Sequence, residues 1–501
     1  MSIELVKHRL GAVRIHWLLG YKPRLGAILV LTLFLLVTRQ SAAQIRQPSP
    51  PPQERFGVNF DSDAGAKIDD YNVAQLKAHW YLDYTFRTTP AHPNNMQYVQ
   101  MIRTNLWHSQ SFTQTVGAAI AANLGALWIV GNEPDRAGQD GLTPDQYAMF
   151  YHDIYTFIKQ RDPTSRVAVG AVVQGTPIRL HYLTLVLDEY QQRYGSPLPT
   201  DVWTVHGFIL PECNKEGCWG ASIPPGLEAF EDEGIQYTVG DHNNLEIFEQ
   251  HIVAFRQWMA DHGYHEKPLI VSEYGILLSP LHGFPYSAVR KFMLGTFDYF
   301  LNTVDNTLGY PADENRLVQS WSWFSLNSPA YDINTGLGFN GNLFDPNTKQ
   351  LEPLGQDFAT CTANLTKEYV DLSLTDLQVM PAMVLTTNTS TVTVQANLIN
   401  NGGIAAQQVT VQLWLIDAQG TRTLAAENTP MATLAPGCAP LRVTLQWQPK
   451  ALDLGHYMLA LEVQASNANQ EANPTDNLLQ QPFLILDQLP GNTLYLPLIS
   501  R

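Results

Sequence analysis

Between Arg55 and about residue 365, short apolar segments alternate with longer stretches of helical spacing. Eight of the apolar segments have the length and composition of buried strands: Phe56–Phe60, His79–Tyr84, Tyr98–Ile102, Leu127–Asn132, Val167–Ala171, Val202–His206, Leu269–Ser272 and Gln319–Phe324. Strands that alternate with helices form parallel sheets, so eight units over about 310 residues predict an α/β fold, a (β/α)8 TIM barrel. An open doubly wound sheet is the alternative, but no glycine-rich phosphate turn follows the first strand.

Two of the intervening helices carry clear signals. Thr143 can cap a helix, Pro144 suits its first turn, and Gln146 completes a capping box. The stretch from Asn243 to His262 has apolar side chains and one histidine at helical spacing. These are Leu245, Phe248, His251, Ile252, Phe255 and Met259.

The C-terminal part of the chain has a different sequence pattern. With 501 residues the chain is too long for one ordinary domain, and after Cys361 the helical periods disappear. Alternating segments such as Val392–Leu398 and Val409–Leu415 are separated by turn-forming residues, as in an all-β immunoglobulin-like sandwich. We therefore expect the barrel at 55–365, the sandwich at 371–486 and a C-terminal tail at 487–501.

The first 43 residues have the features of an export signal. Lys22 and Arg24 precede the apolar run Leu25–Val37, and Ser41 to Ala43 supply small residues for cleavage. The run is shorter than the ~20 residues that span a bilayer, so we expect a signal peptide, with an uncleaved signal anchor as the alternative. A Pro-rich linker at 44–54 follows. The protein is expected to be secreted or extracellular, and membrane-attached only if the segment stays uncleaved.

The four cysteines fit an oxidising compartment. Cys213 and Cys218 enclose a short segment that a disulfide can close, and without further ligands nearby they make a poor zinc site. For Cys361 and Cys438 the sequence leaves two alternatives open, a bridge across the domain boundary or two free thiols.

Two of the predicted strands end in a glutamate. Leu127–Asn132 leads into Glu133 and Pro134, and Leu269–Ser272 leads into Glu273, 140 residues later. The carboxyl ends of barrel strands face one mouth, so both carboxylates are expected there. Paired carboxylates about 5–5.5 Å apart hydrolyse glycosidic bonds with retention of configuration. We expect Glu133 to be the general acid/base and Glu273 the nucleophile, with no metal or organic cofactor.

Further residues near these strand ends are candidate substrate contacts. Asn132 precedes the acid, His206 ends the sixth strand, and Tyr274 follows the nucleophile. Trp321 and Trp323 share one face of the eighth strand, where an indole can support a sugar ring. Residues Leu210–Asp241 follow the sixth strand as a long connection, in which Trp219 is the best candidate for a sugar contact.

Composition excludes some partners. The formal net charge of −16, with only 15% charged residues, leaves no basic surface for nucleic acid. We expect a monomer that acts on a polysaccharide or oligosaccharide. The alternative from another functional class is a non-catalytic carbohydrate-binding or adhesion protein that uses the barrel as a scaffold.

The motifs described above resemble those of clan A glycoside hydrolases, on the residues Asn132-Glu133-Pro134 and Glu273. Within the clan, Gly131 to Asp135 followed by Leu142 to Asp145 resembles the catalytic domains of family 128, as do His79-Trp80-Tyr81 and Trp323-Phe324. The resemblance implies a (β/α)8 fold, retention, the roles given above for both glutamates, and β-1,3-glucan as a substrate. The long connection at Leu210–Asp241 and the sequence Ser272-Glu273-Tyr274 depart from family 128, so families 5, 39 and 53 stay open. The second domain is similar to CARDB modules, which serve as spacers or adhesion units.

Overall fold

The computed structural model describes residues 51–487, except 110, 215–217, 336–337, 386–390, 450–453 and 468–469. The expected signal segment and C-terminal tail, apart from residue 487, lie outside the described residues, as does most of the Pro-rich linker. In the part of the chain that is described, no helix has both the length and the apolar character to cross a membrane.

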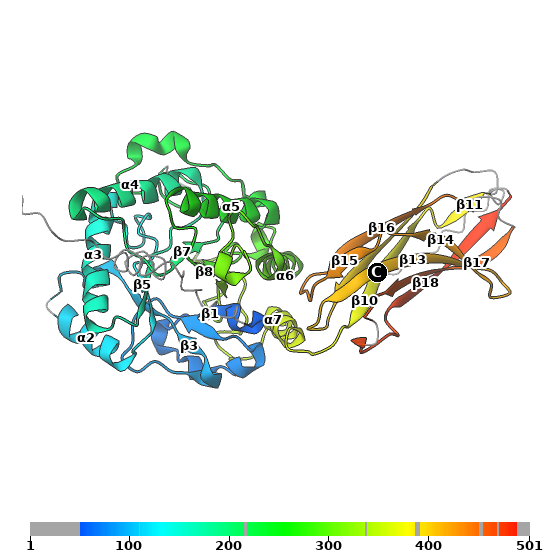
Figure 1. Cartoon of the computed structure of the whole chain (residues 1–501), viewed down its shortest axis with the longest axis horizontal. Coiled ribbons are helices and arrows are strands. Elements are labelled where there is room, and N and C mark those ends of the chain that lie inside the picture. The colour runs from blue at the N-terminus through cyan, green and yellow to red at the C-terminus, as the bar shows by residue number, and fades with distance from the viewer. Residues whose placement is uncertain are drawn as a thin grey trace, which may run out of the picture. The chain divides into compact units, whose positions relative to one another are not determined.

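Parallel strands form the centre of the N-terminal domain (Figure 1). They are β1 (Phe56–Asn59), β2 (Trp80–Leu82), β3 (Gln97–Tyr98), β4 (Gln100–Ile102), β5 (Leu127–Val130), β6 (Arg166–Val169), β7 (Trp203–His206), β8 (Leu269–Tyr274) and β9 (Ser320–Trp323). The pairing order is β3-β2-β1-β9-β8-β7 in one sheet and β4-β5-β6 in the other. Parallel bridges from Ala168 to Val202 and from Val172 to Val205 join β6 to β7, and Val99 alone separates β3 from β4. The sheets thus close into the predicted barrel.

Each of the eight predicted strands is present, but the third is divided. Residues of β3 pair with β2, whereas residues of β4 pair with β5. The chain bends at Val99 because one straight strand of this length cannot keep register with both neighbours of a tilted barrel.

Helices follow most strands: α2 (Phe112–Ala122), α3 (Pro144–Arg161), α4 (Pro177–Tyr194), α5 (Leu245–Asp261), α6 (Tyr286–Asn302) and α7 (Pro353–Asn364). The capping box of α3 is present, with the Thr143 amide donating to Gln146 Oε1 at 3.1 Å. In α5, Asn244 caps the amides of Glu246 and Ile247. Between β1 and β3 the described residues form 3₁₀ turns in place of the helices expected of a regular barrel.

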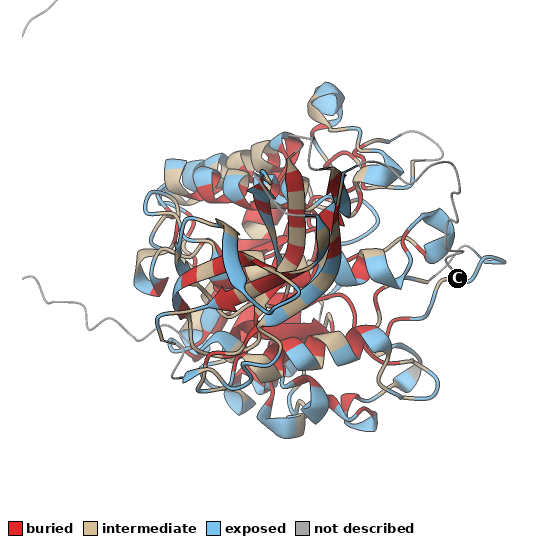
Figure 2. Cartoon of the chain, turned by 90° about the vertical axis from the view of Figure 1, so that its right-hand side faces the viewer, coloured by how far each residue is buried: buried red, intermediate tan, exposed pale blue. Residues whose placement is uncertain are grey.

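Most of the tryptophan content lies in the core. Trp128, Trp203, Trp321 and Trp323 are fully buried. A separate cluster that includes Leu82, Met101, Ile129, Val202 and Ile270 comes from strands around the ring and fills the interior. Figure 2 shows exposed residues on the outer faces of the helices and buried residues beneath them. Aromatic packing therefore accounts for much of the aromatic-rich composition.

The C-terminal domain is the predicted β-sandwich. One sheet contains β10 (Leu372–Met380), β12 (Val392–Asn400) and β16 (Leu441–Trp447). The other contains β11 (Met383–Leu385), β13 (Ala406–Ile416), β14 (Arg422–Glu427), β17 (Gly455–Gln464) and β18 (Leu478–Leu486), and β15 (Met431–Leu434) pairs with β13. Alternate residues of β12 are buried, as period-two patterning requires.

The four cysteines form two disulfides. The predicted bridge between Cys213 and Cys218 is present. Cys361 of α7 pairs with Cys438, which precedes β16, so the alternative of a bridge between barrel and sandwich is correct. Beside it, the Asp298 carboxylate of α6 accepts hydrogen bonds from the amides of Cys438 at 2.5 Å and Ala439 at 2.8 Å.

Candidate active site

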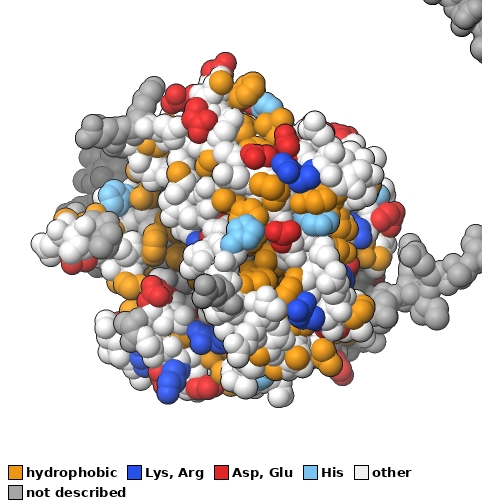
Figure 3. Space-filling view, turned by 90° about the vertical axis from the view of Figure 1, so that its left-hand side faces the viewer, with side chains coloured by type: hydrophobic (Ala, Val, Ile, Leu, Met, Phe, Trp, Pro, Cys, Tyr) orange, Lys and Arg blue, Asp and Glu red, His pale blue; other side chains and the backbone are white. Residues whose placement is uncertain are grey.

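A cleft of about 850 Å³ contains both glutamates that were predicted to be catalytic. Polar side chains line it from the segments after β1 to β5: Asp61, Ser62, Asp63, Asp83, Tyr84, Thr85, Arg103, Asn132, Arg136 and Gln139. Hydrophobic side chains line it from the segments after β7 to β9: Phe208, Leu210, Trp219, Leu277, Leu278, Phe324, Tyr331 and Phe339. Lysine and arginine side chains are scattered singly over the face seen in Figure 3, in keeping with the acidic composition.

Glu133 is delivered to the cleft by a sharp turn at the end of β5. Gly131 has φ +91° and Glu133 has φ +44°, both in the left-handed region. For a residue other than glycine or asparagine this conformation is uncommon and costs on the order of 1 kcal/mol. The Glu133 amide donates to the Ala171 carbonyl oxygen at 3.0 Å, which fixes the turn against the strand next to it, and Pro134 prevents the strand from continuing.

His206 lies between the two glutamates. Its Nδ1 is 3.1 Å from Glu133 Oε1, and its Nε2 is 3.7 Å from Glu273 Oε2. One carboxylate oxygen of each glutamate and one ring nitrogen of His206 all lie within 4.8 Å of one another. Val202 and His206 lie on one face of their segment, as period-two alternation predicts, and Val202 belongs to the interior cluster.

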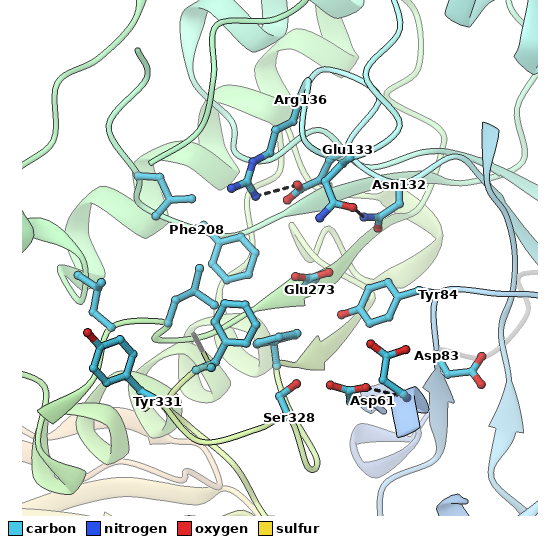
Figure 4. A pocket seen from close by; sticks show the side chains of 18 of the residues that line it. Asp61, Asp83, Tyr84, Asn132, Glu133, Arg136, Phe208, Glu273, Ser328 and Tyr331 are labelled. Atoms are coloured by element: carbon cyan, nitrogen blue, oxygen red, sulfur yellow. Dashed lines mark hydrogen bonds and ion pairs between the residues drawn. The ribbon is translucent and has the colours of Figure 1, made fainter. Parts of the chain in front are cut away.

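Arg136 and Tyr84 complete the charged centre. Arg136 Nη1 is 3.1 Å from Glu133 Oε2, so the carboxylate is held from both sides. Figure 4 shows the Tyr84 hydroxyl pointing toward Glu273 from the opposite wall. Burial raises the pKa of Tyr84 well above its usual value, and the charge of Glu273 adds to this, so the hydroxyl remains a donor.

These contacts set the protonation of the free site. Burial raises the pKa of Glu133, but the hydrogen bonds and charges of His206 and Arg136 lower it by more, to about 2. Burial, with the charge of Glu133, raises the pKa of Glu273 above its usual value, although His206, Tyr84 and Arg136 act in the other direction. Burial lowers the pKa of His206, but the two carboxylates raise it by more. In the free site these contacts therefore favour the ionised form of Glu133 and the protonated form of His206, and burial disfavours ionisation of Glu273.

Asn132 also lines the cleft. Its backbone amide donates to Asp140 Oδ2 at 2.7 Å, and its Nδ2 lies 3.4 Å from Gln139 Oε1. Its Oδ1 atom is buried and has no partner among the described residues. The side chain is thus positioned beside Glu133 with one free acceptor.

Three candidate contacts do not reach the cleft. Tyr274 packs against Phe248 of α5 and Phe300 of α6, and its hydroxyl lies 3.4 Å from Thr296 Oγ1. Trp321 packs on Phe56 and Phe300. Trp323 donates to the Gly341 carbonyl oxygen at 2.7 Å and contacts the Tyr274 ring.

These three positions are a correction to the expected substrate contacts. In β9, side chains alternate between the interior and the helix layer, and Trp321 and Trp323 lie on the helix side. In β8 an irregularity of the register between Val271 and Tyr274 breaks the alternation, so Tyr274 lies on the helix side as well. The aromatic residue of this segment that lines the cleft is Phe324, the next residue along the chain.

Sequence reasoning missed Tyr84 and Arg136. Both had a usable signal: Tyr84 is the last residue of a predicted strand, and Arg136 comes three residues after the predicted acid. At the carboxyl end of a barrel strand, such polar residues are candidates for the site.

A buried ion cluster supports the loop that carries Glu133. Arg179 of α4 pairs with the Asp135 carboxylate and, through Nε at 2.8 Å, with Glu212 Oε1. Thr176 Oγ1 also donates to Glu212 Oε1, and Glu212 Oε2 accepts from the Ile235 amide at 2.9 Å. These side chains connect the turn after β5 to the long connection after β7.

The centre also has the donor set of a metal site. Glu133, His206 and Glu273 are the one group of three or more acidic, histidine or cysteine ligands that meets this spacing within the described residues. Two carboxylates and an imidazole are ligands that Zn²⁺ accepts, with a water molecule as the fourth ligand.

The two domains resemble different known proteins. A family model described as CARDB matches residues 371–481. The solved CARDB domain of a Pyrococcus furiosus protein, in complex with di-metal ions, is 24% identical and covers 25% of this chain and 94% of its own, with a TM-score of 0.20. No curated protein sequence matches the chain.

For the barrel, the similar solved structures include glycoside hydrolases. An endo-β-1,3-glucanase of family 128, subgroup II, from Sorangium cellulosum is 15% identical, covering 61% of this chain and 98% of its own, with a TM-score of 0.39. A curdlan-specific exo-β-1,3-glucanase of subgroup III from Blastomyces gilchristii, in complex with glucose, is 15% identical, covering 62% and 99%, with a TM-score of 0.40. The chain therefore joins a barrel with glycoside hydrolase neighbours to a domain that matches the CARDB family.

Proposed function

We propose that the barrel is a retaining glycoside hydrolase that cleaves β-linked polysaccharides or oligosaccharides. The observation that carries this proposal is the placement of Glu133 and Glu273 in one cleft, on either side of His206, with distances of 3.1 Å and 3.7 Å to its two ring nitrogens. One oxygen of each carboxylate also lies within 4.8 Å of the other. This spacing suits double displacement, which needs about 5–5.5 Å between the carboxylates, and leaves little room for the water of an inverting enzyme.

In the proposed first step, Glu273 attacks the anomeric carbon while the glycosidic oxygen takes a proton from Glu133. The bond from the anomeric carbon to that oxygen breaks, and a covalent glycosyl ester forms on Glu273. In the second step Glu133 accepts a proton from water, whose oxygen displaces Glu273 and restores the free carboxylate. Asn132, which lines the cleft next to Glu133, is our candidate for binding a sugar hydroxyl beside the reacting carbon.

Acid catalysis requires that Glu133 gain a proton that it lacks in the free site. The nearest one is on His206 Nδ1, along the 3.1 Å contact with Glu133 Oε1. A sugar that excludes water from the cleft and displaces Arg136 removes a charge that keeps Glu133 ionised, so its pKa rises as the substrate enters. We assign His206 the role of holding this proton until the substrate binds.

The decisive experiment is product release from a panel of β-1,3-, β-1,4- and mixed-linkage glucans, xylan, mannan and galactan. β-1,3-Glucan heads the panel because the motif around Glu133 resembles that of family 128. Glu273→Gln should lower kcat at least ~1,000-fold while binding persists, and Glu249→Gln, at a half-buried carboxylate of α5 that does not line the cleft, is the matched control. NMR of the first product should show a retained anomeric configuration.

The carbohydrate-binding alternative makes the opposite prediction. A binding protein would retain one polymer without releasing sugar, and Glu273→Gln would match wild type in every assay. That result would overturn the proposed hydrolase.

We also propose that the protein is exported and acts as a monomer. Two disulfides among the described residues support an oxidising compartment. Fractionation of cultures that express the full chain, followed by light scattering of the purified protein, tests both statements.

A further inference from the structure

The connection between β7 and α5 forms the wall of the cleft that carries Trp219. We propose that Trp219 is a stacking platform for the sugar on the leaving-group side of the scissile bond, and that the Cys213–Cys218 bridge holds it in place. The inference rests on the proposed hydrolase and assigns a specificity-determining residue within it. Trp219 is 36% exposed, although most tryptophans of the barrel are buried, and it lines the cleft.

Two backbone hydrogen bonds fix the chain on both sides of Trp219. The Cys213 amide donates to the Ala221 carbonyl oxygen at 3.0 Å, and the Ala221 amide donates to the Pro211 carbonyl oxygen at 2.9 Å. A Cβ atom at Gly220 would lie 2.0 Å from that Pro211 oxygen, so only glycine allows this approach. With the disulfide closing the far end, the tryptophan has a defined position before any ligand binds.

The indole rests on a histidine that is itself fully bonded. The rings of Trp219 and His242 make a T-shaped contact, with centroids 5.7 Å apart and an interplanar angle of 86°. His242 Nδ1 lies 3.0 Å from the Ile209 carbonyl oxygen, and Nε2 accepts from the Leu277 amide at 2.9 Å. Burial lowers the pKa of His242 to about 4, so the ring is neutral and keeps both bonds.

This contact leaves the indole available for a ligand. In a T-shaped pair at most one face of either ring is covered, so at least one face of Trp219 is free of His242. An exposed indole face beside apolar residues such as Leu210 and Leu277 is suited to the flat, apolar face of a pyranose ring.

The same connection lies beside the proposed acid. Ser222, three residues after Trp219, accepts a hydrogen bond from the Ala137 amide at Oγ, at 3.1 Å, and one from Arg179 at its carbonyl oxygen, at 2.9 Å. Ala137 directly follows Arg136, the ion-pair partner of Glu133. The acid protonates the leaving oxygen, so a platform anchored to its loop faces the sugar that leaves.

The test compares two substrates that share the glycone and differ on the leaving-group side. One is a series of oligosaccharides of three to six units from the polymer that the wild type cleaves. The other is the matching β-glycosyl fluoride, which carries no leaving sugar. Trp219→Ala should lower kcat/KM for the oligosaccharides at least tenfold, mainly through KM, and leave the fluoride within twofold of wild type.

Two further variants separate the platform from general damage to the connection. Phe230→Ala removes an aromatic residue of the same connection that is 39% exposed and packs on His181, and it should leave both substrates unchanged. The double variant Cys213→Ser/Cys218→Ser should show the Trp219→Ala pattern in weaker form, about threefold. Equal loss on both substrates, or no loss on either, would overturn the inference.

The experiments distinguish an error in the proposed hydrolase function from an error in the proposed role of Trp219. If the wild type binds a polymer without cleaving it, the hydrolase is wrong, and affinity electrophoresis in that polymer still tests the platform. Unchanged retention of Trp219→Ala in that gel would overturn the platform as well. Absence of both cleavage and retention would overturn both proposals.

Discussion

At the scale of single residues, the two glutamates favour the protonated form of the histidine that lies between them. Glu133 is ionised because His206 and Arg136 both bond to it, whereas Glu273 titrates above its usual range. An acid is expected to be protonated and a nucleophile ionised, and these shifts act in the opposite directions. In the proposed hydrolysis, binding of the sugar would therefore be the event that protonates Glu133. The pH dependence of the reaction then depends on the few groups that touch these carboxylates.

Tyr84→Phe tests the partner of the proposed nucleophile. Glu273 must be ionised to attack, so kcat/KM rises with pH through its pKa, which lies above the usual value. The Tyr84 hydroxyl, which is directed at Glu273, lowers that pKa, so its loss raises the pKa further and moves the acidic limb of the profile to higher pH. Tyr81→Phe, which removes a hydroxyl that donates to Ala91 outside the cleft, should leave the limb in place. A limb unchanged in Tyr84→Phe would contradict the assignment.

The same centre should bind zinc. Glu133, His206 and Glu273 present ligand atoms within 4.8 Å of one another, so Zn²⁺ should compete with the sugar and inhibit hydrolysis. EDTA should reverse the inhibition and should not reduce the activity of the metal-free enzyme, because two carboxylates and water complete the reaction. His206→Gln should raise the inhibitory zinc concentration at least ~10-fold. Inhibition of equal strength in wild type and variant would place the zinc elsewhere.

At the scale of elements, strand positions were predictable and side-chain direction at the strand ends was not. All eight barrel strands were predicted from their short apolar segments. The start of α3 was predicted from the capping box of Thr143 and Gln146, which is present. Trp321 and Trp323 could not be placed from their spacing, because alternation gives two faces and not which face looks inward. Tyr84 was missed for a different reason: it lies two residues beyond β2 with φ +61°, so the direction of its side chain depends on a left-handed turn and not on strand alternation.

The buried ion cluster between elements should be important for stability. Arg179→Met would leave the carboxylates of Asp135 and Glu212 buried without their counter-charge, at a cost of about 3–5 kcal/mol in the free energy of unfolding. Arg290→Met, which breaks the exposed pair with Asp357, should cost less than ~1 kcal/mol. Denaturant titration followed by tryptophan fluorescence measures both values, and similar losses in the two variants would show that the cluster is not structural.

At the scale of the whole molecule, one disulfide joins the barrel to the CARDB-like sandwich in addition to the backbone. The Cys361–Cys438 bridge closes a segment of 77 residues, whereas Cys213–Cys218 closes one of 5. Loop-closure entropy therefore predicts a stabilisation of about 4 kcal/mol for the first bridge and about 2 kcal/mol for the second. Calorimetry of the two double Cys→Ser variants should reproduce this order, and hydrolysis of a glycosyl fluoride should be unaffected by loss of the longer bridge. A reversed order would mean that native contacts, and not chain entropy, decide the effect.

The Cys361–Cys438 bridge also affects how the barrel can be produced without the sandwich domain. A chain that stops before Val370 keeps Cys361, which is 3% exposed on α7, but removes the thiol that pairs with it. It also uncovers the Asp298 carboxylate, whose pKa burial raises to about 6 while the amides of Cys438 and Ala439 bond to it. Such a truncated barrel would carry a free thiol and an uncovered carboxylate on the surface that the sandwich had covered, and it would cross-link into dimers in air. Recombinant work on the isolated barrel should therefore begin with Cys361→Ser and Asp298→Asn together.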